Sequence, residues 1–203
     1  MSSIEVDKIV PATGTSLTLG DSGDTFTIPS GVTLTNNGTA TGFGGGKIGQ
    51  VLQTTVTDTS SYSLSSDASA DITGLSVSIT PSSTSSKILI TTSIMGARSG
   101  DFPILTMFIK RDGTKIGSGV DSSNRFGATA SNVIVQSDPN SFTTIGNQFL
   151  DSPSTTSAVT YQIAVNNNSG VSRTLYINRT EDDADAVGTI RGISTITAME
   201  VLA

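Results

Sequence analysis

The sequence contains no cysteine, no histidine and no tryptophan, and only 14% of its 203 residues are charged. Without cysteine it has no disulfide framework, no thiol nucleophile and no thiolate metal ligand. Without histidine it cannot use Ser-His-Asp catalysis or an HExxH zinc site, and it lacks the usual metal ligand. We therefore expect a protein that is not an enzyme and that carries no cofactor and no metal centre.

Positive charge and long apolar runs are also scarce. The 11 Lys and Arg residues are scattered singly in a chain of net charge −6, so we expect no nucleic-acid partner. No apolar stretch approaches the ~18 residues of a membrane-spanning helix, so we expect no membrane insertion. The opening MSSIEVDKIV does not have the basic and apolar regions of a secretory signal. These absences favour assembly in a cytoplasm and later use outside it.

Turn-forming and β-branched residues dominate the composition, which includes 21 glycines, whereas the residues that build long helices are scarce. From Lys47 onward, short apolar segments alternate with turn signals, and this spacing predicts an antiparallel β-sandwich of jelly-roll type. Asp112-Gly113 predicts a tight hairpin. The expected strands are 50–57, 74–80, 87–95, 104–111, 115–118, 133–136, 143–150, 158–166, 173–178 and 193–202. Two segments, 87–95 and 103–110, are apolar on both faces, so we expect both to be covered on both sides, by the second sheet and by a neighbouring subunit.

The first 46 residues have a different pattern. Three very short alternating segments, LTL (17–19), FTI (26–28) and VTL (32–34), are separated by forced turns, and the stretch closes on GFGGG. This composition predicts a flexible joint and two domains, residues 1–46 and 47–203. Each segment is too short to bury its apolar face alone. The side chains that need a partner surface are Leu17, Leu19, Phe26, Ile28, Val32 and Leu34.

The simplest partner surface is the same segment of identical chains. Three copies closed around an axis would share one thin core and leave no exposed strand edge, so we expect a trimeric β-stalk. The alternative is a monomeric β-meander that packs on the main domain.

The candidate contact residues lie in the expected loops of the sandwich, and their common property is predicted exposure. The acidic cluster at 181–185 could hold Ca²⁺ through carboxylate oxygens, but it lacks the spacing of an EF-hand, and a solvated loop that pairs with Arg179 and Arg191 is the alternative. Carboxylate pairs for glycoside hydrolysis are also possible in these loops, but the aromatic residues that stack sugars are few. The candidate residues are Asp101, Asp121, Arg125, Asn140, Asn168, Asp182 and Asp183.

One stretch, IEVDKIVPATGTSLTLGDSGDTFTIPSGVTLTNNGTATGFGGGK (4–47), resembles the start of tail-fibre and related virion appendage proteins of marine bacteriophages, cyanophages in particular. VLQTTVTDT (51–59), DITGLSVSITPSSTSSKILI (71–90) and LYINRTEDDADAVGTIRGISTITAMEV (175–201) are of the same type.

The resemblance implies a homotrimeric structural protein of the virion. Its N-terminal segment would bind other virion proteins, and its C-terminal sandwich would face outward to attach to a glycan or protein of the host surface. A purely architectural role, as a capsid decoration, collar or tail adaptor without receptor binding, is the alternative.

Overall fold

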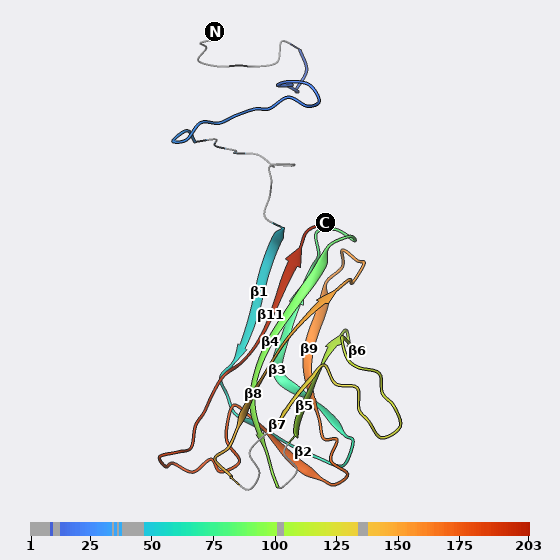
Figure 1. Cartoon of the computed structure of the whole chain (residues 1–203), viewed down its shortest axis with the longest axis vertical. Coiled ribbons are helices and arrows are strands. Elements are labelled where there is room, and N and C mark those ends of the chain that lie inside the picture. The colour runs from blue at the N-terminus through green and yellow to red at the C-terminus, as the bar shows by residue number, and fades with distance from the viewer. Residues whose placement is uncertain are drawn as a thin grey trace. The chain divides into compact units, whose positions relative to one another are not determined.

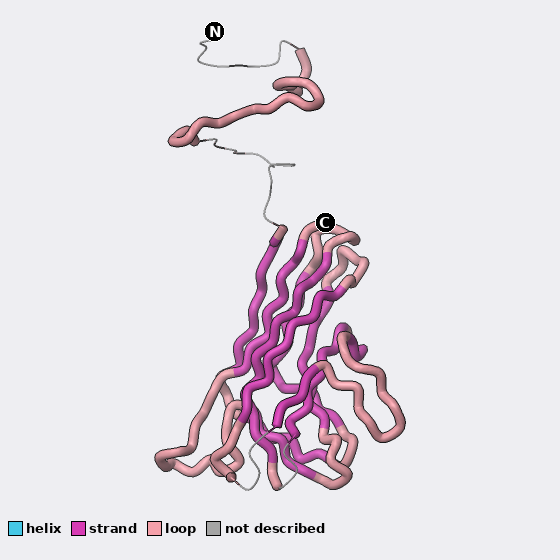
Figure 2. Tube along the Cα trace, viewed as in Figure 1, coloured by secondary structure: helices cyan, strands magenta, loops and turns pink. Residues whose placement is uncertain are grey.

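The computed structural model describes residues 9, 13–33, 35, 37, 47–100, 104–133 and 138–203. The chain divides into two compact units, Met1–Gly45 and Gly46–Ala203. All eleven regular elements of the described residues are β-strands, and all of them lie in the second unit (Figures 1 and 2). The prediction of an all-β chain is confirmed.

In chain order the strands are β1 (Ile48–Val56), β2 (Ser60–Leu64), β3 (Ser69–Ile79), β4 (Lys87–Arg98), β5 (Ile104–Arg111), β6 (Thr114–Ile116), β7 (Ala130–Val133), β8 (Thr143–Asp151), β9 (Val159–Asn166), β10 (Arg173–Ile177) and β11 (Ser194–Val201).

Two antiparallel sheets form the sandwich. In the first sheet, β8 pairs with one edge of β4, while β11 pairs with residues 87–93 and β10 with residues 96–98 along the other edge. β1 lies outside β11, and β2 lies outside β10. The second sheet has the order β3-β9-β5, and β5 also pairs with β6 and β7.

The strand order defines the architecture. The layer β1-β11-β4-β8 belongs to one sheet and β3-β9-β5-β7 to the other, so the connections β3–β4, β4–β5, β7–β8 and β8–β9 each cross between the sheets. Two antiparallel layers linked in this way form a jelly roll. The predicted antiparallel sandwich is confirmed.

Alternation along the strands builds the core. Ile88, Ile90 and Ile94 of β4 point inward and are fully buried, and they pack with β3, β5 and β9 side chains such as Leu75 and Ile163. Burying an Ile or Leu side chain contributes about 1.5–3 kcal/mol. The core therefore lies between the two sheets and holds them together.

Local signals placed most strands correctly. The Asp112-Gly113 hairpin is confirmed, because β5 and β6 pair up to Arg111↔Thr114 and both turn residues have the positive φ of a type I′ turn, 48° and 83°. β7 is Ala130–Val133, whereas the strand was expected at 133–136; residues 134–136 lie outside the described residues.

β2 was not predicted. Its sequence SSYSL is Ser-rich, which is typical of a loop. Pairing with β10 and burial of Tyr62 and Leu64 against the core make it a strand.

A buried carboxylate closes the sandwich at the end where β11 finishes. Glu200 is 1% exposed, and it accepts hydrogen bonds from the backbone N and Oγ of Ser82, both at 2.6 Å, and from Gln50 Nε2 at 2.8 Å. Burial opposes ionisation, but these hydrogen bonds outweigh it and hold the pKa of Glu200 at about 2. Glu200 therefore ties the β3–β4 loop and β1 to β11.

A second buried carboxylate lies between the sheets. Asp151 accepts hydrogen bonds from Arg111 Nη1 at 2.8 and 3.0 Å and from Tyr161 Oη at 2.7 Å. Burial and the hydrogen bond to Asp151 raise the pKa of the Tyr161 hydroxyl. The buried charge of Asp151 is thus compensated by partners from β5 and β9.

The described residues 13–33 of the first unit form turns but no strand. The turn predicted between the segments 17–19 and 26–28 is confirmed at 21–24, because Asp24 N donates to Asp21 O at 3.0 Å and Asp21 N donates to Asp24 Oδ2 at 2.8 Å. The strands expected at 17–19 and 26–28 do not form in the single chain, because a strand needs a hydrogen-bonded neighbour and these segments have none.

Candidate functional site

Two surfaces are candidates for function, and the first is the loop end of the sandwich. One end of the sandwich, where β1 starts, is marked by the residue pairs Ile48↔Val201 and Ile88↔Asp151. The opposite end is marked by the pairs Val56↔Ser194 and Gly96↔Thr143. The β1–β2, β2–β3, β4–β5, β7–β8, β9–β10 and β10–β11 connections meet at this opposite end (Figure 1). Of the predicted contact residues, it carries Asn140, Asn168, Asp182 and Asp183.

The longest of these connections, between β10 and β11, is anchored by one asparagine. Asn178 has a positive φ of 60°, which asparagine tolerates better than most residues. Its buried side chain donates to Val56 O at 2.8 Å and Asp58 O at 3.0 Å, and accepts from Ser194 Oγ at 2.7 Å. Asn178 thereby joins three elements, β1, β10 and β11, at the base of the loop.

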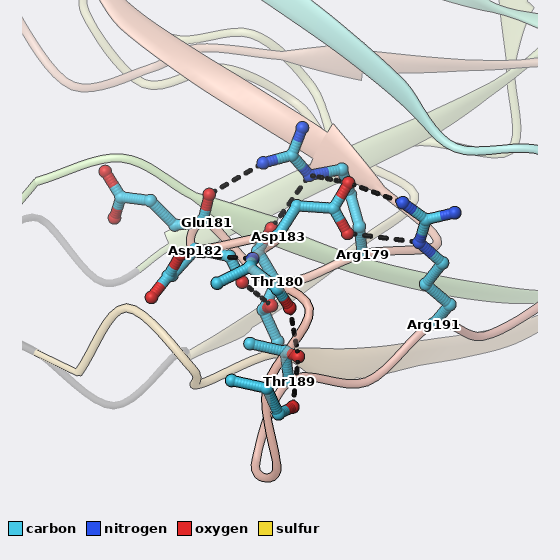
Figure 3. Close-up of polar contacts among 9 residues, drawn as sticks. Arg179, Thr180, Glu181, Asp182, Asp183, Thr189 and Arg191 are labelled. Atoms are coloured by element: carbon cyan, nitrogen blue, oxygen red, sulfur yellow. Dashed lines mark hydrogen bonds and ion pairs between the residues drawn. The ribbon is translucent and has the colours of Figure 1, made fainter.

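Beyond this anchor, ion pairs hold the loop in shape (Figure 3). Asp183 Oδ2 lies 2.8 Å from Arg191 Nη2 and 3.8 Å from Arg179 Nε. The hydrogen bond from Arg191, with the charge of Arg179, lowers the pKa of Asp183, and the same contact raises the pKa of Arg191. Thr189 Oγ1 lies 2.7 Å from both Ala184 O and Ala186 O.

The tip of this loop presents an apolar side chain. Val187 is fully exposed, and Ile190 beside it is half exposed. Next to the tip, a shallow depression of about 420 Å³ is lined by Asp183, Ala184, Asp185, Ala186, Thr189, Ile190 and Arg191. The ordered stem and exposed tip can present a contact surface to another molecule.

At the possible Ca²⁺ site, 181–185, the carboxylate of Asp183 is paired with two arginines rather than free to bind a cation. Within the described ranges, no group of three or more Asp and Glu residues is placed to hold a metal ion. The acidic cluster is therefore best described as the ion-paired stem of a loop.

The structure brings Asn140 and Asp182 together. Asp182 N donates to Pro139 O at 3.0 Å, which joins the β10–β11 loop to the β7–β8 loop. Asn140 and Asp182 are both exposed. These two predicted contact residues thus belong to one continuous surface.

Asn168 lies in a second cluster, with the β6–β7 loop. With its amide oriented to satisfy both neighbours, Asn168 donates to Asp67 Oδ1 at 3.0 Å and accepts from Phe126 N at 3.3 Å. Arg125 and Asp121 line a depression of about 250 Å³ together with Asp67 and Phe126, the two partners of Asn168. Arg125 is exposed there, with its guanidinium on Ser122 Oγ at 3.1 Å.

Asp121 shapes its own loop. It accepts from Lys115 Nζ at 2.8 and 2.9 Å and from Gly127 N at 2.6 Å, and these hydrogen bonds lower its pKa. Asp121 and Asp183 therefore hold loops in place, and Asp101 lies outside the described residues. Sequence reasoning missed Asn178 and Val187; the one available signal was an asparagine directly after an apolar strand.

The second candidate surface is the N-terminal segment. Its apolar side chains are exposed in the single chain: the exposed fractions are 46% for Leu17, 59% for Leu19, 70% for Phe26, 38% for Ile28 and 59% for Val32. Leu34, the sixth predicted core residue, lies outside the described residues. Five apolar side chains are thus exposed within 16 residues, which makes this segment a candidate interaction surface.

No helix in the described part of the chain is both long and apolar enough to cross a bilayer.

Comparisons with known proteins complete the description of the loop end and the N-terminal segment. No protein-family model matches the chain, and no curated protein matches its sequence. Among solved structures, it is similar to a structure of infectious bursal disease virus, Gx strain, with 16% identity, 76% of this chain and 37% of that chain covered, and a TM-score of 0.39. It is also similar to a mutant VP2 protein of infectious bursal disease virus in derived T=1 particles, with 14% identity, 76% and 36% coverage, and a TM-score of 0.40.

The chain thus spans little more than a third of the length of these viral chains. Because both TM-scores are below 0.5, nothing about this chain is inferred from its similarity to these viral proteins. The jelly roll is established by the strand order of the chain itself.

Proposed function

We propose that this chain is a structural appendage protein of a bacteriophage particle. It is a homotrimer whose N-terminal segment binds other virion proteins and whose jelly roll displays its loop end for attachment to a glycan or protein of the host surface. The resemblance of residues 4–47 to phage fibre proteins supports the class. The exposed apolar residues of the N-terminal segment carry the proposal of a trimer.

The physical reason for the trimer is the cost of that exposure. Burying five apolar side chains at about 1.5–3 kcal/mol each would gain on the order of 10 kcal/mol per chain, before the entropy of ordering the segment is subtracted. Sister segments also supply the strand neighbours that residues 17–19 and 26–28 lack. Association therefore provides both the core and the backbone pairing.

Trimerisation also suits attachment. Three copies present three loop ends on one particle, so that weak contacts of each loop gain avidity through effective concentration. Val187 at the tip of the β10–β11 loop is an apolar contact point on an ion-paired stem. The exposed residues Asn140 and Asp182 supply polar contacts at the same end of the sandwich, and Arg125 supplies one in the separate β6–β7 loop.

Light scattering of the full chain tests the oligomer. We expect a mass about three times the 20.7 kDa of one chain at micromolar concentration. Phe26→Asp, which places a charge in the shared core, should lower the mass toward that of one chain. Val120→Asp is the matched control, because Val120 is 92% exposed in a loop of the other unit and should leave the mass unchanged. A wild-type mass near 20.7 kDa contradicts the proposal.

Particles that carry Val187→Asp test attachment. We expect normal assembly and adsorption to host cells reduced at least tenfold. Val120→Asp again serves as the control, since it exchanges an exposed valine in another loop. Normal adsorption of the Val187→Asp particles, together with the failure of particles to assemble when the loop is removed, would instead support the architectural role.

A further inference from the structure

The outer faces of the two sheets are covered differently. On the second sheet, Phe126 of the β6–β7 loop packs edge-to-face on Phe108 of β5, with ring centroids 5.3 Å apart, and Leu105–Ile109 are buried. Of the segment 103–110 that was expected to be covered on both faces, residues 105–109 are so covered within one chain. On the first sheet, the outward residues Leu89, Thr91, Ser93 and Met95 of β4 are only half-buried.

Apolar residues form a row across this outer face. In register, Val51 of β1 pairs with Met199 of β11, Met199 with Leu89 of β4, and Leu89 with Leu150 of β8. Val51 is 55% exposed and Leu150 is 46% exposed. We call this set, Val51, Met199, Leu89 and Leu150, the apolar row.

The two rows on its loop-end side are uncharged, whereas the row on its other side contains Lys87, which pairs with Val201. Toward the loop end follow Gln53, Thr197, Thr91 and Gln148, and then Thr55, Thr195, Ser93 and Gly146. These three rows contain no charged residue, although the chain carries 28 Lys, Arg, Asp and Glu residues. Since each copy has a net charge of −6, copies repel one another generally, and these three uncharged rows are where they can meet without like-charge contacts.

The position of this outer face also favours a sister copy of the chain as its partner. The segment of 45 residues ends where β1 begins, and Ile48 and Val51 lie at that end of the face. A register shift between Ile48 and Val51 interrupts the free edge of β1, and such a bulge disfavours pairing with another strand edge. A sister copy would therefore contact the side chains on the outer face of the first sheet rather than pair with the edge of β1.

We infer that the outer face of the first sheet is the contact between the sandwiches of sister copies, with the apolar row at its centre. This inference rests on the proposed trimer. Chains joined by their N-terminal segments hold their sandwiches at high effective concentration beside the joint, so that a modest apolar contact suffices.

Single cysteines introduced into the full chain test the inference, since the native chain contains none. Gln148→Cys lies in the row next to the apolar row. Ser131→Cys lies on the outer side of β7 and is the matched control, since both native residues are exposed. We expect the thiol at 148 to react with maleimide at least tenfold more slowly than the thiol at 131, and to form inter-chain disulfides under oxidation.

Charge insertion gives the second readout. Leu150→Lys should raise the concentration at which the oligomer dissociates at least tenfold, whereas Val133→Lys, at a valine that is 64% exposed on β7, should not. Equal thiol reactivity at 148 and 131 in a chain of trimeric mass overturns this inference and leaves the trimer intact. A wild-type mass of one chain overturns both.

Discussion

Asn178 shows how much of the loop end depends on one side chain. Its positive φ and its three side-chain hydrogen bonds fix the point where β10 leaves the sheet. Asn178→Ala should lower the free energy of unfolding by about 3–5 kcal/mol, because buried hydrogen bonds are lost and a left-handed backbone is strained.

Asn178→Gly is the informative companion. It loses the same hydrogen bonds but tolerates the backbone, so it should cost about 1 kcal/mol less than the alanine variant. Urea unfolding measures both. Equal stability of the wild type and both variants would contradict the role of Asn178 as an anchor.

Glu200 makes stability depend on acid pH. Its folded pKa of about 2 lies below the ordinary value of 4.5, so the folded state binds fewer protons than the unfolded state between these pH values. Its contribution, about 1–3 kcal/mol for charge-assisted hydrogen bonds, is therefore complete above pH 4.5 and is lost as the pH falls toward 2.

Unfolding of Glu200→Gln as a function of pH measures this contribution. The variant should be less stable than the wild type at pH 7 and should lose less stability on acidification. Glu181→Gln, the same substitution in the β10–β11 loop, should behave like the wild type. A Glu200→Gln curve parallel to that of the wild type would contradict the assignment.

At this scale the sequence gives little warning. Glu200 lies near the end of an alternating strand, β11, and has no charged partner nearby in sequence. Its partners Ser82 and Gln50 come from loops and strands more than 100 residues away. Such long-range partners become visible only in the folded chain.

At the scale of elements, the order of the β10–β11 loop depends on ion pairs. Asp183→Asn removes the pairing with Arg191 and Arg179. We expect protease cleavage within 184–190 to increase severalfold, with no change in the unfolding temperature, because the loop lies outside the core. Asp185→Asn, at an exposed neighbouring carboxylate, is the control. Unchanged cleavage of Asp183→Asn would show that the pairs do not order the loop.

Elements with strong alternation could be predicted, and those that depend on context could not. β5 was placed at its observed bounds because apolar residues and the Asp-Gly turn agree. β2 was missed because Ser60, Ser61 and Ser63 give no strand signal until β10 pairs with them. The contact residues were chosen for exposure alone, whereas the pairing of the acidic cluster with Arg179 and Arg191 could be expected from the sequence, and Asp183 makes both pairs.

At the scale of the whole molecule, the two units pose different physical problems. The jelly roll buries its own core, whereas the described part of the N-terminal segment exposes its apolar residues and forms no strand. Sequence alone separated these two behaviours, because alternation in segments of three residues cannot build a core within one chain. The sequence of one chain does not identify which surface covers the exposed apolar residues of the N-terminal segment.

Amide hydrogen exchange of the full chain at micromolar concentration tests this account most directly. It predicts that amides of residues 17–19 and 26–28 exchange at least tenfold more slowly in the wild-type protein than in Phe26→Asp, while those of the sandwich core exchange equally in both. Fast exchange of these amides in the wild type, at the rate of an unstructured peptide, would contradict it.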